Sequence, residues 1–96
     1  IMFGMGGVFT EILDDNKIRF APFGKNEALS MIETIKSHEI IENYRGMDPV
    51  DKEALSNILI KLGNIAVQFP EIKEIDLNPI IIQDGKPFVV DALFVI

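Results

Sequence analysis

The sequence predicts an α+β domain in which an antiparallel sheet carries two helices on one face. Three observations support this fold class. Strand-forming residues gather near both ends of the chain, apolar residues recur at helical spacing in its middle, and glycine and proline separate these segments. The expected order is therefore a strand pair, two helices and a second strand pair.

Composition excludes several classes of function. The chain has 96 residues, a net charge of -6, one histidine and no cysteine. A chain with no basic patch is a poor ligand for nucleic acid, and without cysteine there is no disulfide, zinc thiolate cluster or thiol nucleophile. No apolar run reaches the roughly 18 residues of a membrane span, so we expect no membrane partner and a cytoplasmic location.

The length and the first residue indicate a piece of something longer. A two-lobed enzyme usually needs about 100–200 residues per domain, so residues 1–96 are expected to form a single domain. The chain also begins with Ile1, on an apolar stretch that runs into a glycine cluster. We therefore expect a fragment that does not work as an enzyme by itself.

The first strand pair is expected around a turn at Asp14–Lys17. Val8–Leu13 is rich in strand formers, and Ile18–Ala21 follows the turn residues. The glycines between Gly4 and Gly7 precede a strand and not a helix N-terminus, so the phosphate-cradling loops of nucleotide-binding helices do not apply.

Two helices are expected next. The first begins near Asn26, a good N-cap, and places apolar side chains at Ala28, Met31, Ile32 and Ile35. The second starts in Asp48–Asp51 and stops at Phe69–Pro70. Its apolar stripe is expected to lie in the core and comprises Leu55, Ile58, Leu59, Leu62, Ile65, Ala66 and Phe69.

The C-terminal strand pair contains the most informative pattern. Asp84-Gly85 is a strong type I′ turn signal, and this turn makes Gln83 face Lys86. The same register then places Asn78 directly opposite Asp91, with Cβ atoms about 4.5–5.5 Å apart. The period of two puts Asp76 on that face as well, together with Ile80, Ile82, Val89 and Leu93.

Three oxygen-bearing side chains converge in this register: Asp76, Asn78 and Asp91. Two neighbouring carboxylates repel each other unless a cation lies between them, and hard oxygen ligands suit Mg²⁺ with its waters and substrate phosphates. The alternative is that Asp76 and Asn78 are solvated positions on a strand and that Asp91 caps another strand. Pro79 lacks a ladder donor and indicates a local break beside Asn78.

The ordered motifs of the chain resemble the C-terminal part of an ATP-grasp domain, in particular that of ADP-forming acyl-CoA (acetyl-CoA) synthetases of the beta-subunit type. They are also similar to the beta subunit of succinyl-CoA synthetases. The resemblance rests on Phe3–Glu11, Arg19–Pro22, Tyr44–Gly46, Phe69–Ile72 and the pair Asp76–Ile80 and Val89–Ala92. It implies an ATP-grasp C-terminal subdomain over residues 1–96.

The resemblance also implies roles for individual residues. Asn78 and Asp91 would hold the Mg²⁺ of ATP or ADP, and Asp76, where the succinyl relatives carry Glu, would meet a phosphohistidine loop. Glu11 would lie near the nucleotide phosphates, or it pairs with Arg19. Apart from the resemblance, the planar guanidinium of Arg45 is suited to meet phosphate, and the alternative is an exposed loop arginine. His38 falls at no matching motif and is expected at the surface.

The function implied by the resemblance is that of an acid-CoA ligase, which interconverts acyl-CoA, ADP and phosphate with carboxylic acid, CoA and ATP. The implied partners are nucleotide, an N-terminal ATP-grasp lobe and a CoA-binding or phosphohistidine subunit or domain, in an oligomer. Two alternatives are a non-catalytic regulatory or assembly module with this fold and the ATP-grasp module of a protein acyltransferase. The sequence leaves the acyl group and the preference for ADP or GDP open.

Overall fold

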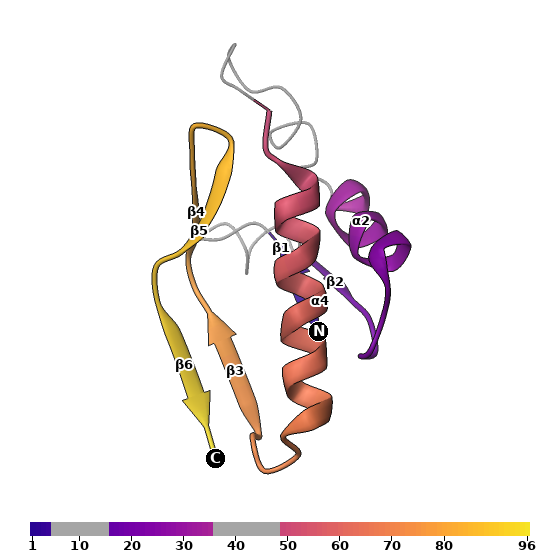
Figure 1. The fold of residues 1–96 in the computed structure, drawn as a ribbon, viewed down its shortest axis with the longest axis vertical. Helices are drawn as coiled ribbons and strands as arrows, with labels where there is room; N and C mark the ends of the chain where they lie inside the picture. The colour runs from indigo at the N-terminus through magenta and orange to yellow at the C-terminus, as the bar shows by residue number, and fades with distance from the viewer. Residues whose placement is uncertain (5–15, 36–48) are drawn as a thin grey trace.

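The computed structural model of the chain describes residues 1–4, 16–35 and 49–96. Figure 1 shows helix α4 between helix α2 on one side and a long hairpin on the other. Within these described residues, the strands are antiparallel and form three two-stranded ladders, in agreement with the predicted α+β class. Within the described part of the chain, no helix has both the length and the apolar character needed to cross a membrane.

The first ladder joins strands β1, Met2–Gly4, and β2, Asn16–Ile18. Phe3 lies opposite Lys17, and the Arg19 N–H extends the pairing by donating to the Ile1 carbonyl at 2.9 Å. The prediction that Asn16 and Lys17 form a turn is therefore wrong. Their local turn preference is overridden because the chain start supplies a strand to pair with. The predicted strand Val8–Leu13 and the residues Asp14 and Asp15 lie outside the described residues.

Helix α2 spans Lys25–Thr34 and buries Ala28, Met31 and Ile32. The predicted helix is confirmed, but its predicted N-cap is not. The cap position is Gly24, which makes no side-chain cap bond, and Asn26 lies exposed inside the first turn. Because glycine is tolerated at this position, the helix starts earlier than the Asn26 signal indicates.

Helix α4 spans Lys52–Gln68 and has the expected N-terminal cap. The Asp51 carboxylate accepts a hydrogen bond from the Ala54 N–H at 3.0 Å. The helix stops before Phe69–Pro70, as predicted, but its apolar stripe is buried only in part. Leu55 and Leu59 are buried, Ile58, Leu62 and Ile65 are half-buried, and Ala66 and Phe69 are exposed. The prediction that Ala66 and Phe69 lie in the core is wrong for this structure.

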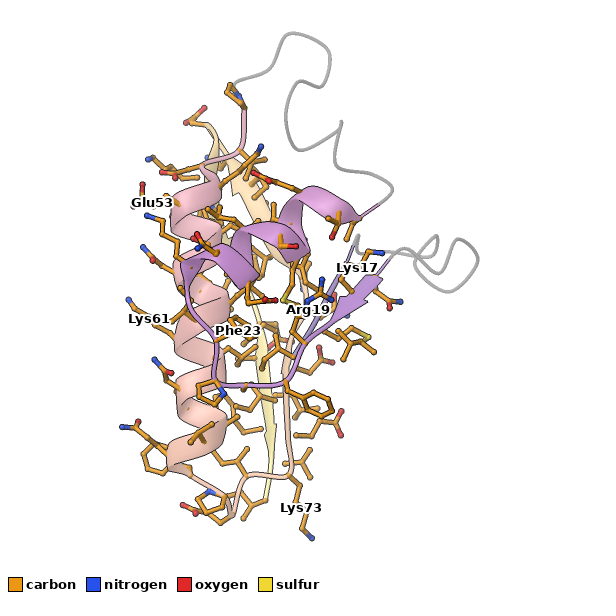
Figure 2. All side chains as sticks on the ribbon, turned by 90° about the vertical axis from the view of Figure 1, so that its right-hand side faces the viewer. Lys17, Arg19, Phe23, Glu53, Lys61 and Lys73 are labelled. Atoms are coloured by element: carbon orange, nitrogen blue, oxygen red, sulfur yellow. The ribbon has the colours of Figure 1, made fainter. Side chains whose placement is uncertain are left out.

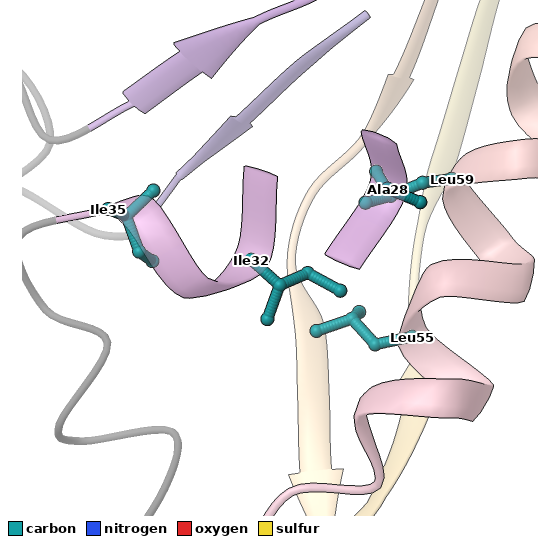
Figure 3. Packing of buried hydrophobic residues seen from close by; sticks show 5 residues of the cluster. All are labelled: Ala28, Ile32, Ile35, Leu55 and Leu59. Atoms are coloured by element: carbon teal, nitrogen blue, oxygen red, sulfur yellow. The ribbon is translucent and has the colours of Figure 1, made fainter. Parts of the chain in front are cut away.

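The core lies between the two helices (Figure 3). Ala28, Ile32 and Ile35 from the first helical segment meet Leu55 and Leu59 of α4. Partly buried residues close this cluster from the remaining elements: Ile1, Phe3, Phe23, Val50, Ile60 and Ile80. The helix pair therefore forms the packed layer on which the strands rest.

Ion pairs at the surface join different segments of the chain. Arg19 Nε donates to Glu27 at 3.1 Å, and Lys25 of α2 pairs with Glu53 of α4. Figure 2 shows Arg19 below α2 and Glu53 near the start of α4. Exposed pairs of this kind contribute little free energy singly, so the buried cluster provides most of the stability.

The C-terminal hairpin has the predicted turn and register. Asp84 and Gly85 both have positive φ, 51° and 78°, as a type I′ turn requires. Gln83 pairs with Lys86, Ile80 with Val89, Leu77 with Ala92 and Glu74 with Val95. The same register therefore holds from the tip of the hairpin to its base.

Each side of the hairpin is divided into two strands. β3, Glu74–Leu77, pairs with β6, Ala92–Val95, and β4, Ile80–Gln83, pairs with β5, Lys86–Val89. The interruption falls at Asn78–Pro79, whose peptide bond is cis, and at Val90–Asp91 on the other side. The local break predicted from Pro79 is confirmed.

The tip of the hairpin is attached to the N-terminus of α4. The Asp51 N–H donates to the Gly85 carbonyl at 2.7 Å, and Lys86 Nζ donates to Asp51 Oδ2 at 2.7 Å. The bond from Lys86, followed by that from the Ala54 N–H, lowers the pKa of Asp51 from its ordinary value of 3.8.

The lowered pKa of Asp51 gives a pH-dependent contribution to stability. A carboxyl whose pKa is depressed by folding stabilises the folded state above its unfolded pKa, and this is lost as the pH falls through the folded pKa. We expect Asp51→Asn to lower the free energy of unfolding at pH 7 and to have little effect below the folded pKa. Chemical denaturation of both proteins at a series of pH values measures this difference. A difference that is constant with pH would contradict the assignment.

Candidate metal centre

Asn78 and Asp91 lie opposite each other at the break in the hairpin. The Asn78 N–H donates to the Asp91 carbonyl at 3.3 Å, and the Val90 N–H donates to the Pro79 carbonyl at 3.2 Å. Both backbone bonds keep the predicted register, so the interruption does not displace one side against the other. The predicted neighbourhood of Asn78 and Asp91 is therefore present in the fold.

The side chains of both residues are exposed. Asp91 Oδ1 accepts a hydrogen bond from the N–H of Ala92, the next residue, at 3.0 Å. This contact is the strand-capping role that the sequence offered as an alternative. It uses one oxygen of the carboxylate and is compatible with a ligand at the other, since a carboxylate has about four acceptor sites.

Asp76 lies on β3, opposite Leu93 of β6. It is exposed, whereas its neighbours Ile75 and Leu77 are half-buried, which places Asp76 on the solvent side of this ladder. The predicted face does not continue unchanged toward the tip. Ile80, which strict alternation groups with Asp76, is half-buried and packs on the core cluster. The half-buried positions thus move by one residue in the alternation at the break, although the pairing register between the two sides of the hairpin stays the same.

The donor chemistry at the break fits Mg²⁺. Carboxylate and amide oxygens are hard ligands, and Mg²⁺ is commonly held by one or two carboxylates while waters and substrate phosphates complete its octahedron. Within residues 1–4, 16–35 and 49–96, no group of three or more His, Cys, Asp or Glu side chains could hold a metal ion. Asn78 and Asp91 with the exposed Asp76 therefore suit an ion shared with a phosphate ligand, and not a cage made by protein alone.

Three residues singled out in the sequence lie outside the described residues: Glu11, Arg45 and His38. Their predicted roles stay predictions. Arg19, the alternative partner of Glu11, pairs with Glu27 and also donates to the Ile18 carbonyl at 2.9 Å.

Sequence reasoning missed one contact near this hairpin, the pair of Lys86 with Asp51. Asp51 was recognised as part of a helix-capping signal and Lys86 as a residue beside the turn. Asp51 and Lys86 are 35 positions apart, and no pattern in the sequence indicates that their two segments are in contact.

Comparison with known proteins decides the family. An ATP-grasp domain model matches residues 1–96, the whole chain. The chain belongs to the ATP-grasp domain family. This match confirms the predicted resemblance and fold. The ATP-grasp chain is also 47% identical over all of its 96 residues to the beta subunit of acetate–CoA ligase [ADP-forming] I of Pyrococcus furiosus.

Two further similarities agree with this family. Acetate–CoA ligase [ADP-forming] I of Archaeoglobus fulgidus is 38% identical over 96 residues. The acetyl-coenzyme A synthetase 1 of Ca. Korarchaeum cryptofilum, solved with coenzyme A and Mg-AMPPCP, superposes with a TM-score of 0.91 at 45% identity over 98% of this ATP-grasp chain. Its phosphohistidine segment is described as pointing towards the nucleotide binding site.

The ATP-grasp chain corresponds to only part of each relative. It spans 41% of the P. furiosus subunit, 14% of the A. fulgidus protein and 44% of the solved K. cryptofilum chain. In each of these relatives, the matching region is therefore only part of a longer chain.

Proposed function

We propose that the chain is the part of an ADP-forming acyl-CoA ligase that holds the Mg²⁺ of the nucleotide. The observation that carries the proposal is the direct opposition of Asn78 and Asp91 at the break in the hairpin. Support comes from relatives that are ADP-forming ligases and from a similar chain solved with Mg-AMPPCP.

The overall reaction converts acyl-CoA, ADP and phosphate into a carboxylic acid, CoA and ATP, and it runs in both directions. Mg²⁺, when bound, neutralises the charge that phosphoryl transfer places on the phosphate oxygens. Asn78 and Asp91 would fix the position of the nucleotide phosphates through this ion, one from each side of the hairpin. Phosphoryl transfer depends mainly on such positioning and charge neutralisation.

Asp76 has a separate role in this proposal. Asp76 is exposed, and its ladder pair with Leu93 is the second pair from the break. Within residues 1–4, 16–35 and 49–96, its carboxylate has no hydrogen-bond partner. We assign it to the contact with a phosphohistidine segment of the CoA-binding subunit or domain. A carboxylate there would accept a hydrogen bond from an imidazole N–H and orient the ring. Glu11 is proposed to lie near the nucleotide phosphates, and Arg45 is proposed to meet phosphate.

The proposal is tested by ATP formation in the complete protein, together with any subunit that it requires. With acetyl-CoA as a probe, ATP should appear only when ADP, phosphate and Mg²⁺ are all present, and free CoA should appear in equal amount. Removing Mg²⁺ with a chelator should stop the reaction, and adding Mg²⁺ back should restore it. No ATP from acetyl-CoA or from other acyl-CoA thioesters would contradict the proposed ligase function.

A further inference from the structure

The hairpin that carries Asn78 and Asp91 is attached to the ends of α4 at two places (Figure 1). At its base, a short connection leads from the end of α4 into β3. There the Ile72 N–H donates to the Phe69 carbonyl at 3.0 Å, and the Lys73 N–H donates to the Val95 carbonyl at 2.7 Å. At its tip, the Asp51 N–H donates to the Gly85 carbonyl at 2.7 Å. The hairpin is thus held near both helix ends.

Besides this backbone bond, the attachment at the tip includes one carboxylate with two functions. Asp51 Oδ1 caps α4 through the Ala54 N–H at 3.0 Å, and Oδ2 accepts from Lys86 Nζ at 2.7 Å. Gly85 is buried against this junction, which is unusual for a hairpin turn because turns normally lie in solvent. The pair of Asp51 and Lys86 therefore fixes strand β5 to the start of the helix.

The candidate metal centre lies between these two attachments. At Asn78–Pro79 and Val90–Asp91 the regular ladder is interrupted, so it does not set the angle between β3–β6 and β4–β5. A helix of 17 residues is a rigid rod of about 25 Å. The helix holds the far end of each ladder, and two backbone bonds join the two sides of the hairpin at the break. A shift at the tip is therefore expected to change how Asn78 and Asp91 face each other.

We propose that Asp51 and Lys86 are positioning residues for the metal centre, a role that rests on the proposed function of Asn78 and Asp91. They act through the hairpin, since Lys86 lies at the tip and Asp91 lies at the break, beyond the far end of strand β5. Metal ligands must be held within a fraction of an ångström, so a modest change at the tip reduces Mg²⁺ affinity.

Four single-residue variants of the complete protein, and one double variant made from two of them, test this role. Lys86→Met removes the ammonium and keeps an apolar stem, and Lys86→Arg keeps a cation. Asp51→Asn weakens the bond to Lys86 but retains a good N-cap residue. Lys25→Met is the matched control, because it makes the same Lys→Met change at another ion pair to the first turn of α4, that with Glu53.

The measured quantity is the Mg²⁺ requirement, taken well below the melting temperature in two ways. One is the Mg²⁺ concentration that gives half-maximal ATP formation at saturating ADP, and the other is the Mg²⁺ concentration that half-maximally tightens ADP binding in a calorimetric titration without acyl-CoA. Lys86→Met and Asp51→Asn should each raise it by about three- to tenfold, and the double variant should be no worse than either single one because both break the same contact. Lys86→Arg and Lys25→Met should stay within about twofold of the unmodified protein, and kcat at saturating Mg²⁺ should change little.

Three results would overturn the role. An unchanged Mg²⁺ requirement in Lys86→Met and Asp51→Asn, with a strong effect of Asp91→Asn, would leave the metal centre in place and remove only the positioning role. An equal shift in Lys25→Met would indicate a general loss of stability. An unchanged requirement in Asp91→Asn would contradict the proposed function itself, and the positioning role with it.

Discussion

Asp91→Asn should lower Mg²⁺-dependent ATP formation at least about a hundredfold while the free energy of unfolding changes by no more than about 0.5 kcal/mol. The substitution replaces a charged oxygen ligand with a neutral amide of nearly the same shape, so it removes charge from the centre without leaving a cavity. Asp91 is exposed, and its bond from the Ala92 N–H can be kept by an amide oxygen. Steady-state kinetics and chemical denaturation of the same protein measure the two effects.

The matched control is Asp84→Asn. It makes the same chemical change on the same hairpin, at an exposed turn residue whose φ of 51° asparagine also adopts readily. Activity and stability should both stay close to those of the unmodified protein. If Asp91→Asn instead lost stability and activity in proportion, Asp91 would be a structural strand cap and no metal ligand.

Leu59→Ala should lower the free energy of unfolding by about 2–5 kcal/mol, one of the largest effects on stability expected among the described residues. Leu59 is 3% exposed and lies in the cluster between α2 and α4. Truncation removes three carbons from a packed site and leaves a cavity that neighbouring helices cannot close fully. Urea denaturation monitored by circular dichroism measures the change.

Val67→Ala on the same helix is the comparison for Leu59→Ala. Val67 is 53% exposed, so its truncation should change the free energy of unfolding by no more than about 0.5 kcal/mol. Equal losses at Leu59 and Val67 would contradict the placement of the core between the two helices.

The C-terminal hairpin was the most predictable part of the fold. Its turn residues, Asp84 and Gly85, need positive φ, and the two-residue loop then fixes every pair down to Glu74 and Val95. Local chemistry decides this register, so it can be derived from sequence alone. The opposition of Asn78 and Asp91 follows from the same turn.

The first strand pair and the ends of the stripe on α4 were less predictable, because they depend on distant segments. Asn16 and Lys17 favour a turn locally, yet they pair with residues near the chain start. Periodicity identifies the apolar face of α4, but only packing decides that Leu55 is buried and that Phe69 is 46% exposed. Pattern alone does not say how far along the helix its neighbours reach.

The residues of the candidate site were predictable from the sequence, whereas the burial of the residues around them was less predictable. The spacing of Asp76, Asn78 and Asp91 placed them together, and the structure keeps all three exposed near the break. The shift in burial at Ile80 was not predictable, because strict alternation assumes an unbroken strand. The bond between Asp51 and Lys86 depends on tertiary packing, which no sequence spacing encodes.

The measurement that tests the metal centre most directly is a calorimetric titration of the complete protein with ADP, with and without Mg²⁺. It compares the unmodified protein with Asn78→Ala, and Asp84→Asn serves as the control. We expect Mg²⁺ to tighten ADP binding in the unmodified protein and the control, and this gain to be lost in Asn78→Ala while metal-free ADP binding persists. An equal gain from Mg²⁺ in Asn78→Ala would contradict the assignment of the metal to this hairpin.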